Sequence, residues 1–272
     1  MDTLHFLYKT IPGRMVLKLL TRPGLSVASG RFLDSRASRL LIKPFIKSSG
    51  MDTRDYQMVD FSCFNEFFCR HVLEGKRVFP EDKSTLSSPC DGLLKVYPIR
   101  DGLVLPVKQS SYSIANLLRS EKLAEQYEGG YALVFRLCVD NYHRYAYFES
   151  GRKSKNRKIA GVLHTVRPIA LQEVPVFTEN AREYSLIKTE KFGTAVQMEV
   201  GALLVGKIVN DEEGPANVLR GQEKGHFEYG GSTIILLLQK DKVKIRENIL
   251  RASMSGQESP VKMGDTLGVS LI

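Results

Sequence analysis

The 272-residue sequence contains no tryptophan, only four cysteines and only five histidines, and it has no internal repeat or low-complexity segment. The cysteines lack the paired spacing of a zinc site and the density of a disulfide framework, so we predict reduced thiols and no metal site. No uncharged apolar run approaches the roughly 20 residues that a helix needs to span a bilayer. The N-terminus lacks the apolar core and small-residue cleavage site of a signal peptide. With 43% hydrophobic and 25% charged residues, the composition is globular and excludes disordered and fibrous classes.

Positive charge is concentrated near the N-terminus. The formal net charge is +9, and residues 1–50 hold nine Lys or Arg against two acidic residues, so +7 of the excess lies there. These basic residues alternate with apolar clusters such as Met15-Val16-Leu17 and Leu40-Leu41-Ile42, a pattern typical of amphipathic helices at an anionic membrane surface. We predict that residues 1–60 form a basic, helical, membrane-associating region and that the protein is peripheral, at the cytoplasmic face of the cell membrane. The alternatives are helices that pack on the main domain while their lysines are merely solvated, and nucleic-acid binding, for which no recognised motif is present.

The chain changes character near residue 61. A helical pattern up to about Ser49 is interrupted at Pro12, Pro23 and Pro44, and Phe61–Arg70 predicts a helix with Ser62 as its cap. From Leu86 onward, short apolar runs between Gly, Pro and Asn/Asp turns predict strands at 93–97, 103–107, 131–139, 145–148, 158–166, 184–189, 195–208 and 233–238, with one helix at 113–127. We therefore expect an α+β fold, with helices in the N-terminal third and a mostly antiparallel β sandwich or barrel in the remainder, and a second, β-rich domain at residues 61–272.

Three separated segments carry residues of chemical interest. Gly230-Gly231-Ser232-Thr233 runs into an apolar segment, and a serine at a strained Gly-Ser peptide can attack the preceding carbonyl and so cleave its own chain. Asp91 follows Ser-Pro-Cys just before a predicted strand, and His143 lies in the polar segment Asp140–Tyr145. Taken singly, each has an ordinary explanation: a hairpin turn, a turn carboxylate and a hydrogen-bonded histidine.

Taken together, in this order and with matching sequence between them, these segments resemble the phosphatidylserine decarboxylases. The resemblance covers roughly Phe61 to Ile245. The matching segments are Ser62-Cys63-Phe64-Asn65-Glu66-Phe67-Phe68-Cys69-Arg70, Gly75-Lys76-Arg77, Ser88-Pro89-Cys90-Asp91-Gly92, Tyr142-His143-Arg144-Tyr145, Gly161-Val162-Leu163-His164-Thr165-Val166-Arg167-Pro168, Val200-Gly201-Ala202-Leu203-Leu204-Val205-Gly206, Arg220-Gly221-Gln222-Glu223-Lys224-Gly225 and Gly231-Ser232-Thr233.

The resemblance implies a proenzyme that cuts itself between Gly231 and Ser232. Residues 1–231 would become the β chain and residues 232–272 the α chain, held together as a heterodimer that could pair further into a homodimer. Attack of the serine hydroxyl on the Gly231 carbonyl gives an ester, which β-elimination splits. Hydrolysis of the resulting dehydroalanine then leaves a pyruvoyl group derived from Ser232, so no external cofactor is implied.

The resemblance further implies conversion of phosphatidylserine to phosphatidylethanolamine and carbon dioxide. The pyruvoyl ketone would form a Schiff base with the substrate amine and accept the electrons released with carbon dioxide, as pyridoxal phosphate does. His143 would act as the acid–base or carboxylate-positioning residue, Asp91 would assist self-processing, and Arg144 is a candidate contact for the substrate. The implied fold is a lipoyl-like barrel-sandwich that the strand Thr233–Leu238 completes.

One position departs from the family pattern. Many members carry a second histidine three residues after the first, assigned with the aspartate and the serine to a self-processing triad, and this chain has Ala146 there. Either His143 serves both roles, or His164 or His226 reaches the site, or the chain processes poorly. We favour the first explanation, because proton transfer needs only hydrogen-bond reach and a suitable pKa. The alternative function is that of an unprocessed, inactive homologue that binds phospholipid at the membrane.

Overall fold

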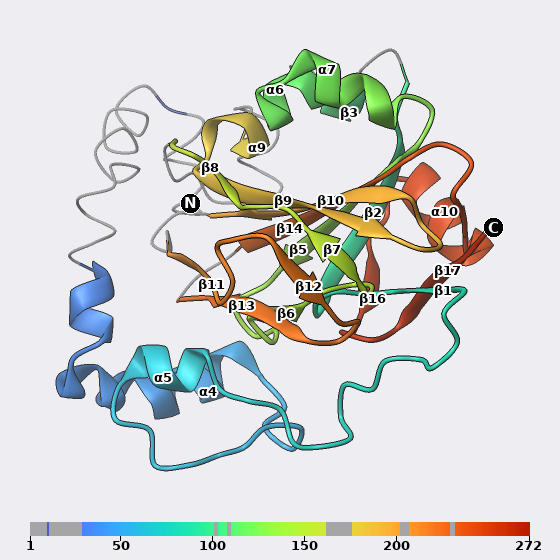
Figure 1. Cartoon of the computed structure of the whole chain (residues 1–272). Coiled ribbons are helices and arrows are strands. Elements are labelled where there is room, and N and C mark those ends of the chain that lie inside the picture. The colour runs from blue at the N-terminus through green and yellow to red at the C-terminus, as the bar shows by residue number, and fades with distance from the viewer. Residues whose placement is uncertain are drawn as a thin grey trace.

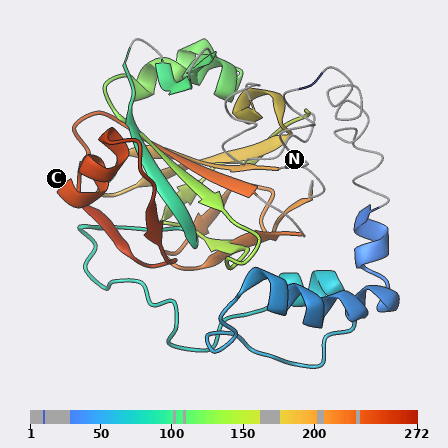
Figure 2. The same ribbon diagram turned by 180° about the vertical axis from the view of Figure 1, so that it is seen from behind.

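The computed structural model describes residue 10 and residues 29–100, 103–107, 110–161, 176–201, 207–228 and 232–272. These residues form stacked layers (Figure 1). Short helices lie on one side of a large central sheet, a smaller sheet lies on the other side, and a second group of helices lies beyond the smaller sheet. The reverse view shows the same order of layers (Figure 2). The helices above the central sheet are α6 (Ile114–Leu118), α7 (Glu121–Ala124) and α9 (Val176–Glu179), and those beyond the smaller sheet are α4 (Ile42–Ser49) and α5 (Phe64–Phe68).

The central sheet is antiparallel throughout and has nine strands among the described residues. Strand β14 (Ser232–Leu238) lies at its middle, and all seven of its residues are buried. Such a continuous apolar run is what a strand covered on both faces requires. The strand order is β12 (Ala216–Val218), β7 (Gly151–Lys153), β9 (Arg182–Thr189), β10 (Thr194–Val200), β14, β5 (Tyr131–Leu137), β2 (Gly92–Pro98) and β16 (Ser259–Val261), with β8 (Arg157–Ile159) pairing β9.

The two faces of the central sheet belong to two different apolar clusters. Ile235 and Leu237 of β14 pack with α6, α7 and α9, whereas Ile234 and Leu236 face the other way, because side chains alternate along a strand. The second face is covered by two three-stranded sheets and by α10 (Glu247–Met254). These sheets are β11 (Ile208–Asn210), β13 (Glu223–Phe227) and β6 (Arg144–Ala146), and β1 (Thr85–Ser87), β17 (Thr266–Ser270) and β15 (Val243–Ile245). The arrangement is a sandwich whose interior lies between β14 and the smaller sheets.

A third apolar cluster joins the N-terminal helices to the sandwich. It contains Leu33, which lies just before the 3₁₀ helix η1 (Arg36–Leu41), residues of α4 and of α5, and Tyr142 from the sandwich. The predicted domain boundary at residue 60 therefore falls inside this cluster. The predicted helix at Phe61–Arg70 is confirmed as the shorter α5, but its N-cap is Cys63. Ser62 lies one residue earlier, where its hydroxyl donates to the Glu66 carboxylate at 2.6 Å.

The predicted α+β class and antiparallel core are confirmed, but the lipoyl-like barrel-sandwich type is not, because the described strands form open sheets and no closed barrel. The predicted helix at 113–127 is wrong as a single element. It breaks at Arg119, whose positive φ of 52° ends α6, and Ser120 then caps α7. Pro44 lies in the first turn of α4, where a proline is tolerated. The predicted breaks at Pro12 and Pro23 lie outside the described residues.

Within the part of the chain that the structure describes, no helix is both long enough and apolar enough to cross a bilayer.

Candidate active site

Ser232 is the first residue of β14, at the centre of the sandwich. It pairs with Leu137 of β5, and the next residue, Thr233, pairs with Val200 of β10, so neighbouring strands hold the head of β14 on both sides. Ser232 is fully buried, and its Oγ has no hydrogen-bond partner among the described residues. A buried hydroxyl without a partner is unusual, because most buried polar atoms are hydrogen-bonded. The predicted scission residue Gly231 lies outside the described residues.

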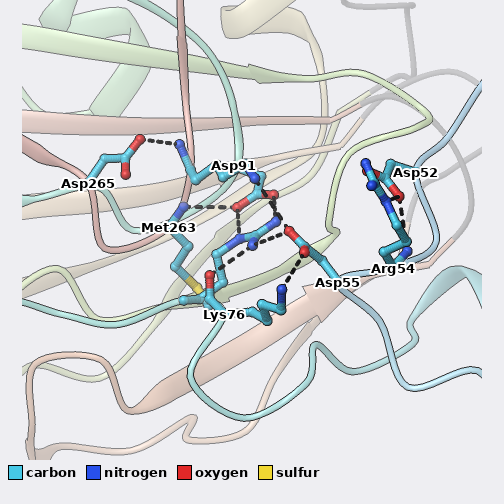
Figure 3. Close-up of polar contacts among 9 residues, drawn as sticks. Asp52, Arg54, Asp55, Lys76, Asp91, Met263 and Asp265 are labelled. Atoms are coloured by element: carbon cyan, nitrogen blue, oxygen red, sulfur yellow. Dashed lines mark hydrogen bonds and ion pairs between the residues drawn. The ribbon is translucent and has the colours of Figure 1, made fainter.

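Asp91 immediately precedes β2 and is held by a buried ion pair (Figure 3). Arg77 donates from Nε to one carboxylate oxygen at 2.8 Å and from Nη2 to the other at 2.7 Å. The backbone N–H of Met263 donates to Asp91 Oδ1 at 2.8 Å. Gly92 must follow, because a Cβ at that position would lie 2.9 Å from the backbone oxygen of Arg136 in β5. Asp91 therefore fixes the start of β2 against the segment before it and against the C-terminal part of the chain.

His143 lies in the connection between β5 and β6 and is fully buried. Its Nδ1 is 3.0 Å from the carbonyl oxygen of Asn141, and its ring centroid is 4.2 Å from that of Phe68 in α5. The backbone N–H of Phe227, near the end of β13, donates to the His143 carbonyl at 2.9 Å. The imidazole is thus held in a fixed orientation between the helical layer and the smaller sheet.

The strand register brings the three predicted site residues to one end of the sheet. Ser232 and Leu137 pair directly, and Leu93 of β2 pairs with Arg136, so the start of β2 lies beside the end of β5. With strands about 4.8 Å apart, the heads of β14 and β2 are separated by about 10 Å. The β6 strand that follows His143 is tied to the Asp91 turn, since the Ala146 N–H donates to the Pro89 carbonyl at 2.8 Å.

A cavity of about 460 Å³ lies beside Asp91, lined also by Asp55, Tyr56, Arg77 and Lys262 among others. Neither Ser232 nor His143 is among the described residues that line this cavity. The cavity therefore reaches the predicted site only at its carboxylate end.

The remaining candidates are His226 and His164 as bases and Arg144 as a substrate contact. Burial lowers the pKa of His226 to about 4, with the cations of Arg144 and Lys207 adding to the effect. His226 is next to Arg144 across the β13–β6 pair, and His164 lies outside the described residues. The Arg144 guanidinium forms an ion pair with Glu223 and donates from Nε to the Cys69 carbonyl at 2.7 Å. The Arg144 guanidinium therefore binds two groups of the protein itself, Glu223 and the Cys69 carbonyl.

Comparison with known proteins identifies the family of this chain. A family model described as Phosphatidylserine decarboxylase matches residues 64–269, a span that contains Asp91, His143 and Ser232. The chain belongs to the phosphatidylserine decarboxylase family. It is 45% identical over 267 residues to phosphatidylserine decarboxylase proenzyme 2 of Clostridium acetobutylicum, which covers 97% of this chain and 91% of the relative. It is 40% identical over 270 residues to the phosphatidylserine decarboxylase proenzyme of Ruminiclostridium cellulolyticum, covering 97% and 90% of the two chains.

The family's second histidine would stand at Ala146, which is buried at the end of β6. The Ala146 carbonyl accepts from Gln197 Nε2 of β10 at 3.0 Å, so this position lies directly over the central sheet. Sequence reasoning missed two features of the site: Arg77 as the partner of Asp91, and the buried acid Glu199 on β10. A signal was present for Glu199, because Gln197 and Glu199 alternate with apolar residues and therefore lie on one face of an otherwise buried strand.

We expect Asp91→Asn to lower the free energy of unfolding by about 3–5 kcal/mol, because it leaves the buried Arg77 guanidinium without its main counter-ion. The matched control is Asp52→Asn, which removes the exposed ion pair with Arg54 drawn apart from Asp91 in Figure 3 and should shift the unfolding midpoint very little. Urea unfolding, with every variant in a Ser232→Ala background so that each sample is one chain, makes the comparison. Equal midpoint shifts for the two variants would contradict this role of Asp91.

Proposed function

We propose that this protein is a phosphatidylserine decarboxylase that first cleaves itself between Gly231 and Ser232. The observation that carries the proposal is Ser232 itself, which lies at the head of a central strand, fully buried, with a hydroxyl that no described residue binds. A hydroxyl used only for structure would normally be satisfied by a hydrogen bond. A nucleophile has to be held in place while its oxygen stays available.

Cleavage at this position would give a β chain of residues 1–231 and an α chain of residues 232–272 that remain associated. The α chain would contribute β14, paired on one side with β10 and on the other with β5. It would also contribute β16, paired with β2, and β17, paired with β1. Apolar burial and ladder hydrogen bonds from four β-chain strands hold such a fragment without a covalent link.

The residues around Ser232 fit a pyruvoyl group formed from it. Ser232 Oγ, to which no described residue forms a hydrogen bond, lies where such a group would be carried, at the start of a strand that pairs with Leu137 and Val200. When formed, this group supplies an electron sink for loss of carbon dioxide from an amine-bearing substrate. The rest of the site has to orient the substrate carboxylate, exclude water and move protons.

His143 is the residue we assign to proton movement in the decarboxylation. Its buried ring is oriented by the Asn141 carbonyl and by Phe68, and its backbone is tied to β13. A neutral imidazole whose Nδ1 donates to a carbonyl presents Nε2 as a proton acceptor. Asp91 acts on the site through position, since its ion pair with Arg77 fixes the turn to which β6 is bonded. Arg144 stays a candidate substrate contact.

The basic N-terminal region would bring the site to a membrane surface, with residues 61–272 as the catalytic domain. In the described part of this region, Leu40 is 81% exposed and Phe32 52% exposed. Both lie close in sequence to the exposed basic residues Arg36 and Lys43. Exposed apolar side chains among cations suit insertion into an anionic lipid surface. We place the protein at the cytoplasmic face, as a peripheral protein.

The test is decarboxylation of phosphatidylserine presented in phosphatidylserine/phosphatidylcholine vesicles, read as phosphatidylethanolamine formed and carbon dioxide released. Burying a leucine contributes roughly 1.5–3 kcal/mol, so Leu40→Ser should weaken vesicle binding by about tenfold or more. Met254 is 86% exposed and is the last residue of α10, a helix that lies away from α4 (Figure 1), so Met254→Ser is the matched control and should bind as the unmodified protein does. Equal binding by the two variants would reject the membrane-facing role of residues 1–60.

Ala146 favours a second candidate function, an inactive homologue that only binds phospholipid. In that case vesicles would bind the protein, no phosphatidylethanolamine would form, and the chain would stay whole. Formation of product by the purified protein would eliminate this candidate.

A further inference from the structure

A buried ion pair lies inside the sandwich, between β10 of the central sheet and β13 of the smaller sheet. Lys224 Nζ is 2.7 Å from Glu199 Oε2, and neither side chain has any exposed surface. Lys224 also donates to Asn210 Oδ1 at 2.8 Å, and Asn210 donates in turn to Glu183 at 2.9 Å. Burying two charges is expensive, and a hydrophobic pair of similar volume would often be as stable. The pair is therefore a poor explanation of stability and a reason to look for a role in the chemistry.

Only one oxygen of the Glu199 carboxylate is used by this network. Oε2 accepts from Lys224, whereas Oε1 is buried and has no hydrogen-bond partner among the described residues. Burial raises the pKa of Glu199, and the Lys224 ammonium only partly offsets the effect. A carboxylate in this setting is a stronger base than an exposed one. Lys224 fixes one oxygen and leaves the other to accept a proton.

The strand register places this carboxylate beside Ser232. Glu199 pairs directly with Ile234, and Ser232 lies two residues before Ile234 on the same strand, so all three side chains point to the same face of the sheet. Glu199 and Ser232 are diagonal neighbours, and residues so placed on adjacent antiparallel strands are about 7–8 Å apart, a span that a glutamate side chain reaches across. Glu199 Oε1 and Ser232 Oγ, two buried polar atoms to which no described residue forms a hydrogen bond, thus lie on one face of two adjacent strands.

We propose that Glu199 is the proton acceptor for the Ser232 hydroxyl in self-cleavage and that Lys224 is the residue that positions it, an inference that rests on the proposed function. Glu199 Oε1 takes the hydroxyl proton as Ser232 Oγ bonds to the Gly231 carbonyl carbon. The Gly231–Ser232 C–N bond then breaks, and the same proton passes to the Ser232 nitrogen, which leaves as an amine. The products are an ester and an amine, and the step needs no co-reactant.

The assignment also accounts for Ala146. That residue lies over β10, where its carbonyl accepts from Gln197, the neighbour of Glu199 on the same face. A base on β10 of the central sheet therefore lies across the sandwich interior from position 146, which belongs to β6 of the smaller sheet. No histidine at position 146 is required for the first proton transfer.

Removing the carboxylate alone is expected to slow scission. Glu199→Gln keeps the shape and should reduce the rate of appearance of the two chains by about 10²–10⁴-fold, the usual contribution of a positioned general base. Scission is followed by denaturing mass spectrometry after synthesis, so the readout does not depend on decarboxylation. Because Glu199→Gln leaves Lys224 buried with a neutral partner, the paired variant Glu199→Leu/Lys224→Met removes both charges and preserves apolar packing. It should be folded and remain uncleaved.

The control is a different buried ion pair, Glu149 with Arg220, whose side chains are 8% and 9% exposed. Glu149→Leu/Arg220→Met makes the same chemical change away from Ser232 and should leave scission at the unmodified rate. A folded Glu199→Leu/Lys224→Met protein that cleaves normally would overturn the proposal and make the pair structural. Failure of the unmodified protein to cleave would instead reject the proposed function on which the inference rests.

Discussion

Ser232→Ala is expected to leave one uncleaved chain near 30.6 kDa and to abolish decarboxylation. The substitution removes the oxygen that attacks the Gly231 carbonyl and the atoms from which the pyruvoyl group is built. Both activities should therefore fall by more than about 10³-fold, as expected when a nucleophile is deleted. Stability should change little, because Ser232 Oγ forms no hydrogen bond with a described residue whose loss would be felt.

Ser185→Ala is the matched control for this variant. Ser185 is also a fully buried strand serine, on β9, and its Oγ also lacks a partner among the described residues. The Ser185→Ala protein should cleave itself and decarboxylate phosphatidylserine as the unmodified protein does. Denaturing mass spectrometry and phosphatidylethanolamine formation measure the two activities. Two chains in the Ser232→Ala sample would mean that scission occurs elsewhere.

His143→Gln is expected to separate the two activities. The chain should still be cleaved, because Glu199 takes the serine proton, whereas decarboxylation should fall by about 10²–10⁴-fold with loss of a positioned acid–base group. The loop between β5 and β6 should keep its fold, because Phe68 still packs against position 143 and the Phe227 N–H still donates to the carbonyl of that residue. His71 is exposed, and His71→Gln should change neither activity.

An uncleaved His143→Gln chain with a native unfolding midpoint would contradict this division of roles. It would restore the interpretation favoured by the sequence alone, in which one histidine serves both steps. Cleavage with undiminished decarboxylation would instead remove His143 from the catalytic machinery.

Strong local patterns made much of the fold predictable. The strands β2, β5 and β14 are each mostly apolar, and each was predicted within two residues of its observed ends. The strands β12 and β13 were missed, because β12 spans only three residues and β13 is mostly polar, so each depends on pairing with its neighbours more than on an apolar pattern of its own. Helix α10 was missed for a similar reason: only Ile249 and Ser253 of it are buried, which is too narrow an apolar face to stand out.

The sequence predicted the individual site residues, but not the residues that contact them. Ser232, Asp91 and His143 stand in distinctive local sequences, and the register brings their strands to one end of the sheet. Their partners come from distant segments: Arg77 lies 14 residues from Asp91, and Lys224 lies 25 residues from Glu199. Contacts of this kind depend on tertiary packing, which residue patterns do not encode locally.

Self-cleavage at Gly231–Ser232 is tested most directly by a denaturing intact-mass spectrum of the freshly purified, unmodified protein. We expect two chains, of which the smaller begins at residue 232 and carries a blocked terminus with the mass of a pyruvoyl group. A single species near 30.6 kDa would contradict self-cleavage and would leave a phospholipid-binding homologue as the better description of this protein.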